Sequence, residues 1–368
     1  MTEKIIIRQA TLADKPALAV FLAAAYEGRH QYKFPRRWEW AFQHNPFLQG
    51  EGLPIWIAVT ADGGIVGQSA ALVEPLIIHG REYRVGWGVD FHVLEAYRGR
   101  GLGTQLQAAN NAAHEIFMSL SMTEGAASIK AALGLQPLPA VPVFTKIVNH
   151  DPASVLDTLH TRFPRVPTSS LKFIAAPLAQ FLTRRDAGFA LRQAQGAPRG
   201  EPVEPLIKPM EAFSGEFDAL WERLSPKFTA LIRRDAAYLT WKFRQQPHMA
   251  HEIFAARQAD ALCGYLILRR ARPPERNAGI ICDLFADPED DATIGTLLHH
   301  AVLHLREAGV TYITAASSVP AYQIALRALG FKHTKSATPL IRAGVVDVPQ
   351  EGWLLGKGDH DWDQYPLA

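Results

Sequence analysis

The stretch 86-GWGVDFHVLEAYRGRGLGTQLQAANNAAHEIF-117 decides the fold of this chain. An apolar run typical of a strand leads into Gly99, Gly101 and Gly103, and apolar residues at helical spacing follow them. Glycine adopts backbone angles that other residues resist, and it lets a ligand approach the main chain. The first N–H groups of a helix have no partner within it and lie at the positive end of the helix dipole. The turn therefore predicts an anion site that suits phosphate oxygens.

Two common phosphate-binding turns do not fit these residues. A P-loop needs Gly-Lys followed by Ser or Thr, and here Thr104 follows a glycine with no lysine. A dinucleotide-binding turn needs glycine where Thr104 stands. The remaining pattern is Arg-x-x-Gly-x-Gly, formed by Arg98, Gly101 and Gly103, and Arg100 adds a further positive charge.

This pattern resembles the pyrophosphate loop of the GNAT superfamily of acyl-CoA N-acyltransferases. The order of the surrounding elements is also similar to that family: a capped first helix, a hairpin, a long strand, the loop with its helix, another strand, and a short helix that ends at Gly134. The resemblance covers roughly residues 4–147 and, more weakly, residues 204–343. It implies an α/β fold with mixed sheets, in which two tandem GNAT-like domains each carry a mostly antiparallel sheet flanked by helices.

Local signals predict where the elements of the first copy begin and end. Thr11 and Asp14 have capping-box spacing before a helix that runs to about Tyr26. The residues 62–64 predict a hairpin turn, and Gly134 predicts the end of a short helix. We further expect a strand over 83–94, a helix whose apolar spacing extends from 102 to 117, and a strand over 118–122.

Similar signals recur about 200 residues later in the chain. The motif Trp-x-Phe-x-x-x-Pro begins at Trp40 and again at Trp241. Three further matches follow the same order at offsets of 192 to 200 residues: Arg8 with Lys208, Leu102-Gly103-Thr104 with Ile294-Gly295-Thr296, and Leu133-Gly134 with Leu329-Gly330. Chance rarely provides four matches in the same order, so we infer an internal duplication. Each copy is too long for a solenoid repeat, so the duplication predicts two similar domains.

The duplication predicts four segments. We expect an acyl-CoA-binding GNAT-like domain over 1–150, a helical segment with a linker over 151–202, a degenerate GNAT-like domain over 203–345, and a C-terminal tail over 346–368. Part of the linker is a Gly/Pro/Gln stretch at residues 193–205.

The second copy departs from the pattern at the loop. When Gly103 is aligned with Gly295, Arg98 falls on Asp290 and Gly101 falls on Thr293, within the acidic run ADPEDDATIG. Carboxylates in this position would repel a pyrophosphate. We therefore expect that only the first copy binds a coenzyme.

The resemblance also implies which residues contact coenzyme A. His92 and Val93 would supply main-chain contacts to the pantetheine arm and the thioester carbonyl. The loop residues Arg98, Gly99, Arg100, Gly101, Leu102, Gly103 and Thr104 would hold the pyrophosphate.

Asp90 and His92 are the candidate catalytic residues. They are two positions apart, so they share one face of a regular strand, and a carboxylate beside an imidazole suits proton transfer. A bulge in the strand or a structural role for Asp90 would remove this arrangement. The family often places a tyrosine as general acid where Lys130 stands, and an exposed helix lysine is the simpler expectation there.

Composition narrows the class of protein. A chain of 368 residues is too long for one ordinary core, and its net charge of +2 implies neither a nucleic-acid nor a membrane partner. Cys263 and Cys282 lie in apolar runs and are expected to be buried, reduced thiols. No secretory signal is evident, and we expect a cytoplasmic protein without a metal.

Together these features predict an N-acyltransferase that moves an acetyl group from acetyl-CoA, as co-substrate, to a small-molecule amine by direct attack in a ternary complex. Two alternatives stay open: a non-catalytic acyl-CoA sensor or scaffold, and an acyl or aminoacyl transferase for cell-wall or exopolysaccharide precursors. The two halves would pair as an internal pseudo-dimer, or the chain would form a homodimer.

Overall fold

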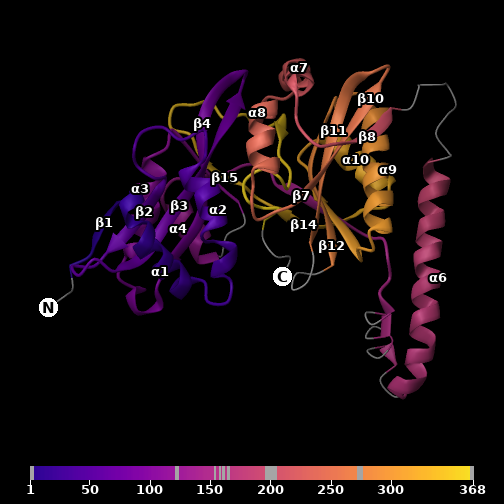
Figure 1. The fold of residues 1–368 in the computed structure, drawn as a ribbon, viewed down its shortest axis with the longest axis horizontal. Helices are drawn as coiled ribbons and strands as arrows, with labels where there is room; N and C mark the ends of the chain where they lie inside the picture. Colours follow the sequence, from indigo (N-terminus) through magenta and orange to yellow (C-terminus); the bar gives the residue numbers. More distant parts are fainter. Residues whose placement is uncertain are drawn as a thin grey trace.

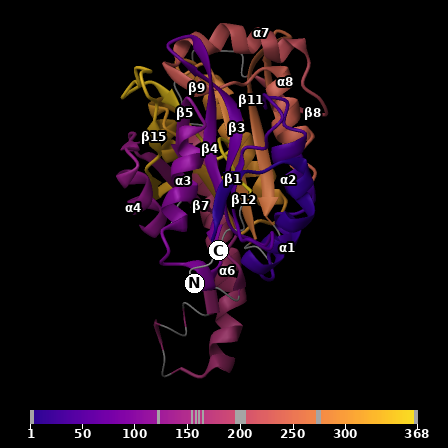
Figure 2. The same cartoon turned by 90° about the vertical axis from the view of Figure 1, so that its left-hand side faces the viewer.

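A computed structural model describes residues 4–120, 124–152, 155–156, 159, 162–163, 166–194, 205–271 and 277–364 of the chain. Its strands form two mixed sheets flanked by helices, which lie side by side in Figure 1. The predicted fold class is therefore confirmed, and two sheets fit a tandem arrangement. Figure 2 shows the first sheet from the side.

The first sheet consists mainly of strands from the first half of the chain. Its main path follows the order β1 (Ile6–Gln9), β2 (Ile55–Val59), β3 (Ile65–Ile78), β4 (Arg81–Val93), β5 (Ile116–Ser119), β15 (Leu340–Arg342) and β6 (Gln136–Pro137). β9 (Ala230–Ile232) pairs with β3, and β16 (Trp353–Leu354) pairs with β9. The β4–β5 and β9–β16 pairs are parallel, and the other pairs are antiparallel.

The second sheet consists mainly of strands from the second half. Its order is β14 (Lys332–Ala337), β7 (Val141–Ile147), β13 (Tyr312–Ala316), β12 (Ala278–Ala286), β11 (Ala261–Ala271), β10 (His251–Gln258) and β8 (Leu206–Met210). The strand β7 comes from the first half and lies between β14 and β13. In return, β9, β15 and β16 of the second half join the first sheet, so each half contributes to the sheet of the other. The expected domain boundaries stay a prediction.

Helices cover both sheets. The first half carries α1 (Lys15–Ala25), α2 (Arg36–Trp38), α3 (Leu102–Ala112) and α4 (Glu124–Ala132), and the second half carries α7 (Gly215–Leu224), α8 (Ala236–Leu239), α9 (Asp291–Glu307) and α10 (Pro320–Ala328). Short 3-10 turns lie at Leu12–Asp14, His30–Tyr32, Glu95–Tyr97 and Ser225–Lys227, and π-helical turns lie at Glu39–Gln43 and Thr240–Arg244. The long helix α6 (Thr168–Ala194) stands apart from both sheets in Figures 1 and 2.

Several local predictions are confirmed. Thr11 and Asp14 form the expected capping box, and a hairpin joins β2 to β3. Helix α4 is followed by Gly134 at φ +82°. Most of the predicted linker at 193–205 lies outside the described residues.

One predicted boundary is wrong. α3 ends at Ala112, and Phe117 lies in β5 rather than in the helix. The apolar residues of β5 are fully buried, and a short buried strand continues a helical apolar pattern by coincidence. The predicted strand at 118–122 therefore begins earlier, at Ile116, and residues 121–123 lie outside the described ranges.

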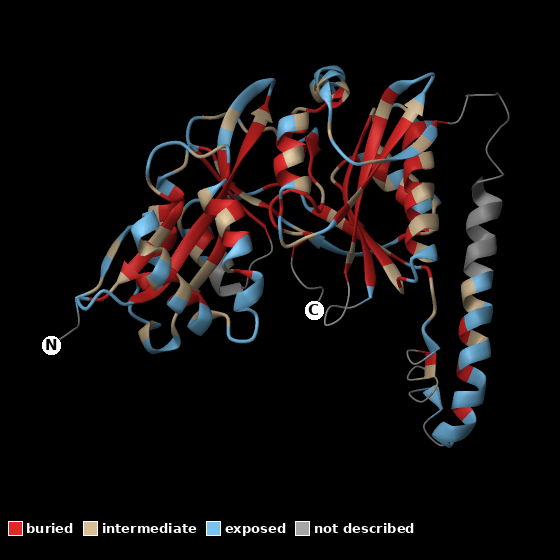
Figure 3. Cartoon of the chain, in the orientation of Figure 1, coloured by how far each residue is buried: buried red, intermediate tan, exposed pale blue. Residues whose placement is uncertain are grey.

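The two halves share one core. Trp40 and Trp241, the first residues of the repeated motif, stack with ring centroids 4.8 Å apart, and Trp40 Nε1 donates to the Trp241 carbonyl at 3.0 Å. Both lie in π-helical turns, so the repeated motif produces the same local structure twice. The central strands of both sheets are buried, whereas α6 is largely exposed where its side chains are described (Figure 3). Cys282 is buried and Cys263 is half-buried, and neither forms a disulfide.

Within the described ranges, none of the helices combines the length and the apolar character that crossing a membrane requires.

Candidate functional site

The site begins where β4 and β5 diverge. These parallel strands pair over three residues each, and the last pair is Trp87 with Met118. β4 runs on to Val93, whereas β5 ends at Ser119 and pairs on its other edge with β15. Among the described strands, none pairs with this edge of β4 beyond Trp87. Side chains already contact the carbonyls of Gly88, Asp90 and Val93, and a ligand could bind the main-chain groups that remain.

The glycine turn lies at the end of this unpaired edge. Gly99 and Gly101 adopt φ of +77° and +74°, which glycine tolerates best, and Gly101 directly precedes α3. Residues 98–101 are exposed. Arg98 donates from Nε to the Val93 carbonyl at 3.0 Å, which holds the turn against the end of β4. The turn thus places the uncapped N–H groups at the start of α3 next to two arginines.

Asp90 lies in a β-bulge of β4. Gln68 of β3 pairs with His92 and Ala70 pairs with Val89, so the register shifts between these pairs. The φ of Asp90 is +49°, in the left-handed region that non-glycine residues seldom occupy. The regular strand geometry behind the sequence prediction is therefore absent at this position, as the bulge alternative anticipated.

Each carboxylate oxygen of Asp90 forms an ion pair with a basic side chain. Lys33 Nζ lies 2.6 Å from Oδ1, and Arg37 Nη1 lies 2.5 Å from Oδ2. Burial alone would raise the pKa of Asp90, but Arg37 and Lys33 outweigh it and hold the pKa below its ordinary value. Asp90 is thus a charged, sequestered carboxylate with little basicity.

His92 is more accessible than Asp90. Its ring is half-buried, with its centroid 5.6 Å from that of Tyr26 and 6.3 Å from that of Phe21. Burial lowers the pKa of His92, and the charge of Arg98 adds to the shift, so the imidazole is neutral at neutral pH. Asp90 and His92 both contact residues of the segment from α1 to α2, but the Asp90 carboxylate binds Lys33 and Arg37 rather than the imidazole.

Lys130 is not the exposed helix lysine that was expected. Only 4% of its surface is exposed, and its Nζ donates to the Ser119 hydroxyl of β5. A Cβ atom added to Gly88 of β4 would lie 3.2 Å from this Nζ, so the ammonium sits at the closed end of the diverging strands. Burial lowers the pKa of Lys130 to about 8. The isolated helix pattern of α4 gives no signal for this burial.

The segment between α1 and β2 contains residues beside β4 that sequence reasoning missed. In the stretch that follows α1, Trp38 and Trp40 pack in the core. Lys33 and Arg37 of this stretch hold Asp90, and Lys33 Nζ lies 5.4 Å above the Tyr26 ring. Two basic residues four positions apart in an aromatic stretch were the available signal.

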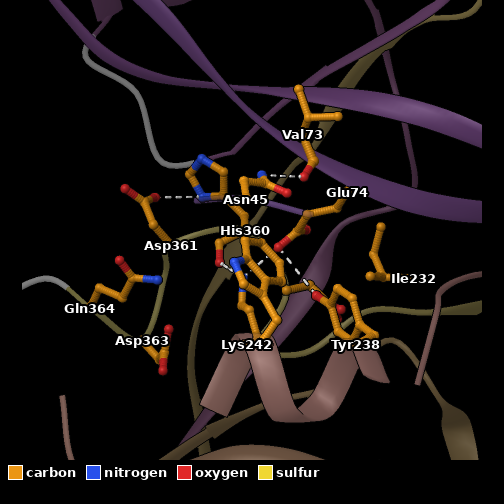
Figure 4. Close-up of polar contacts among 12 residues, drawn as sticks. Asn45, Val73, Glu74, Ile232, Tyr238, Lys242, His360, Asp361, Asp363 and Gln364 are labelled. Carbon is orange, nitrogen blue, oxygen red and sulfur yellow. Dashed lines mark hydrogen bonds and ion pairs between the residues drawn. The ribbon is translucent and has the colours of Figure 1, made fainter. Parts of the chain in front are cut away.

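The C-terminal tail lies between the two halves. His360 Nε2 is 3.3 Å from the Gly88 carbonyl, and its ring centroid is 5.3 Å from that of Trp87. Lys242 Nζ donates to the His360 carbonyl at 2.6 Å and to Glu74 at 2.5 Å (Figure 4). The tail therefore reaches the closed end of the diverging strands from the side opposite Lys130.

The start of α9, which corresponds to the start of α3, is capped by a carboxylate of the chain itself. Asp290 caps α9, and its carboxylate accepts from the Thr293 N–H at 3.0 Å and from the Thr293 hydroxyl at 2.6 Å. A phosphate would have to displace this carboxylate. That the acidic second turn does not bind a coenzyme stays a prediction, and this cap is the physical reason for it.

One group of side chains could offer donor atoms to a metal. His251, Cys282 and Asp363 are buried, and their donor atoms lie within 4.8 Å of one another. Burial raises the pKa of the Cys282 thiol well above its ordinary value, and Arg269 and Lys357 already place positive charge nearby. A protonated thiol beside two cations disfavours a divalent ion.

A cavity of about 220 Å³ lies elsewhere, near the start of β4, and is lined in part by Trp56, Arg84 and His114. The beginning of β4 is far from the glycine turn along the strand, so this cavity does not belong to the site.

Comparisons with known proteins agree with this geometry. Residues 19–124 match the model of the acetyltransferase (GNAT) family. Among curated protein sequences, no significant match was found.

Solved structures match almost the whole chain. A GCN5-related N-acetyltransferase from Anabaena variabilis aligns with a TM-score of 0.59 and 11% identity, covering 92% of this chain and 73% of that one. The N-myristoyltransferase of Saccharomyces cerevisiae, with bound myristoyl-CoA, aligns with a TM-score of 0.55 and 11% identity, covering 93% and 79%. A GCN5-related N-acetyltransferase from Kribbella flavida aligns with a TM-score of 0.54 and 13% identity, covering 93% of this chain and 71% of that one. These identities show similarity of fold alone, and the family match covers residues 19–124, less than half of the chain.

Proposed function

We propose that the first half of this chain is an N-acyltransferase that moves an acetyl group from acetyl-CoA to an amine of a small molecule. One observation carries the proposal: the exposed glycine turn at the start of α3 continues the unpaired edge of β4. Together they offer main-chain groups to a pyrophosphate at one end and to an extended thioester arm along the strand. The family match supports the same class of chemistry.

The turn has room for the coenzyme. A Cβ atom added to Gly99 would meet no atom within 4 Å, so the space above it is open. The N–H groups of Leu102, Gly103 and Thr104, in the first turn of α3, would bind the pyrophosphate oxygens, with Arg98 and Arg100 adding positive charge. The main-chain groups of His92 and Val93 would bind the pantetheine arm and the thioester carbonyl.

In this proposal His92 is the general base. The amine nitrogen attacks the thioester carbonyl carbon, the C–S bond breaks, and the neutral imidazole takes the proton from the attacking nitrogen. The half-buried position of His92 and its lowered pKa suit that role. Asp90 cannot share the proton readily, because Lys33 and Arg37 already hold its carboxylate. We assign it to positioning.

Lys130 is the proposed general acid. The thiolate that leaves the thioester needs a proton, and the ammonium of Lys130 lies at the closed end of the diverging strands, beside Gly88. A pKa of about 8 lets this ammonium donate near neutral pH. Tyrosine often holds this position in the family, so lysine here replaces a phenol with an ammonium of similar reach.

A non-catalytic acyl-CoA sensor is the second candidate. Two observations favour it: Asp90 is neutralised by cations, and the C-terminal tail occupies space next to Gly88 and Trp87. Such a protein would bind acetyl-CoA without turning it over.

Titration calorimetry tests the proposal first. Acetyl-CoA should bind the wild type at one site per chain, and Gly101→Glu should abolish binding because a side chain and a negative charge would occupy the turn. Gly295→Glu in the second half is the matched control, since a Cβ atom there meets nothing within 4 Å. Binding followed by coenzyme A release with a panel of amines would support the transferase, and binding without release with any amine would favour the sensor. No binding would contradict both.

A further inference from the structure

The C-terminal tail brings acidic residues to each half of the molecule. Asp359 and Asp361 are almost fully buried, and they are two positions apart in the chain. Asp361 Oδ2 lies 2.8 Å from Arg37 of the first half, and Asp359 Oδ1 lies 2.9 Å from Arg234 of the second half. A buried carboxylate is stable only when it is paired, so these contacts explain why the tail can lie between the halves.

Arg37 joins the tail to the bulge of β4. Its Nη1 lies 2.5 Å from Asp90, its Nη2 lies 2.8 Å from Asp361, and its Nε donates to Gln364 at 3.2 Å. Only 3% of the Arg37 side chain is exposed. Because a guanidinium is planar with donors in fixed directions, its contacts to the tail restrict the direction in which it meets Asp90.

The bulge needs such support. Asp90 has left-handed backbone angles, which a non-glycine residue adopts only when its surroundings enforce them. The side chain is held by Arg37 and Lys33, and the Asp90 carbonyl accepts from Gln68 Nε2 at 3.0 Å. The bulge sets the directions of the N–H and carbonyl groups on the free edge of β4, where the thioester would lie.

The second half repeats this arrangement without the coenzyme turn. β12 has a register shift beside Asp283, and Arg234 lies between Asp283 and Asp359, at 3.1 Å and 2.9 Å. The set Asp283, Arg234 and Asp359 thus corresponds to the set Asp90, Arg37 and Asp361. The two sets are similarly buried, so one provides a control for the other.

We propose that Arg37 and Asp361 are positioning residues for acyl transfer: Asp361 of the tail orients Arg37, which holds Asp90 and therefore the bulge of β4. The C-terminal tail would thereby govern turnover in the first half without contacting the substrate. This inference rests on the proposed acyltransferase function. Its test also includes a hydrogen-exchange measurement that does not depend on that function.

The test compares Asp361→Asn with Asp359→Asn. Both variants remove one buried tail charge, so both should lower thermal stability. Asp361→Asn should lower kcat by up to about a hundredfold, because a misplaced reacting group loses rate steeply, while the Kd for acetyl-CoA stays unchanged. Asp359→Asn should leave kcat near the wild-type value.

Amide hydrogen exchange of the peptide that covers residues 88–93 provides the independent measurement. Asp361→Asn should speed its exchange, and Asp359→Asn should not. If Asp361→Asn does not fold, Asp361→Glu should keep the exchange slow, and Arg37→Lys, which keeps the charge but lacks the planar set of donors that reaches Asp90, Asp361 and Gln364 together, should speed it.

The outcomes separate the two proposals. If the wild type binds no acetyl-CoA, the proposed function fails, and the exchange experiment still decides the positioning role. Unchanged exchange at 88–93 in Asp361→Asn, or equal effects of the two tail variants, would overturn the positioning role even in an active enzyme.

Discussion

At the scale of residues, two buried charged groups near β4, Asp90 and Lys130, differ in whether an opposite charge lies beside them. Asp90 has two cationic partners and stays ionised. Lys130 donates to the Ser119 hydroxyl and lies 5.9 Å from the Phe117 ring centroid, and among its described contacts there is no carboxylate. Uncompensated burial disfavours the charged form, which makes Lys130 a proton donor near pH 8 and a source of instability.

Replacing Lys130 with methionine separates these two effects. Because kcat depends on a protonated acid, wild-type activity should fall as the pH rises above about 8. Lys130→Met should lose this alkaline limb and about a hundredfold in kcat. Lys130→Tyr, which keeps an acid at the position, should retain more activity than Lys130→Met. An unchanged alkaline limb in Lys130→Met would contradict the role as acid.

Lys130→Met should lower activity but raise the stability of the folded chain. The pKa of Lys130 is about 8 in the folded chain and 10.5 ordinarily, so the unfolded state binds more protons between these values. Lys130 therefore lowers the free energy of unfolding at neutral pH. This destabilisation becomes smaller as the pH rises from about 8 to 10.5. Lys130→Met should raise the free energy of unfolding at pH 7 by on the order of 3 kcal/mol, measured by urea denaturation. A loss of stability at pH 7 would contradict the assignment.

At the scale of elements, α3 and α9 begin in similar places but serve different purposes. α3 starts after a left-handed glycine, and no side chain caps its first N–H groups. α9 starts with Asp290, whose carboxylate satisfies the Thr293 N–H from within the chain. One helix start is therefore available to a phosphate, and the other is closed by its own cap.

Asp290→Ala tests the difference between these helix starts. Loss of the cap should lower the free energy of unfolding by about 1 kcal/mol. It should not create a second acetyl-CoA site, because the turn before α9 lacks the glycines that let a ligand approach. Calorimetry should still give one site per chain, and Asp291→Ala, which removes an exposed charge next to the cap, is the control. Two sites would mean that the cap alone had blocked the second half.

At the scale of the molecule, buried ion pairs join the two halves. Lys242 of the second half lies 2.5 Å from Glu74 of β3, and neither side chain is more than 1% exposed. Tyr238 donates to the same carboxylate at 3.2 Å. With the exchanged strands β7 and β15, these contacts make each half part of the environment of the other.

Lys242→Met should destabilise the whole chain by about 3 to 5 kcal/mol, because Glu74 would be left charged and buried. The double variant Lys242→Met with Glu74→Gln should recover much of this loss. Lys15→Met is the surface control: its pair with Glu39 is about one third exposed and should contribute less than about 1 kcal/mol. Chemical denaturation measures all three, and equal losses in both lysine variants would contradict the buried role of Lys242.

The sequence by itself determined the features that depend on a few neighbouring residues. The glycine turn, the capping box and the hairpin follow from backbone preferences that act over a handful of positions. The fold class and the acidic character of the turn before α9 also came from patterns along the chain. Helix and strand boundaries failed where an apolar run fitted both structures, as at Phe117.

The tertiary structure alone decided which charges meet. Arg37 and Asp361 are 324 positions apart, and no local pattern links them. The bulge at Asp90, the burial of Lys130 and the exchange of β7 and β15 likewise depend on segments that approach only in the folded chain. The physical reason is that burial and ion pairing are set by neighbours in space, whereas turns and caps are set by neighbours in sequence.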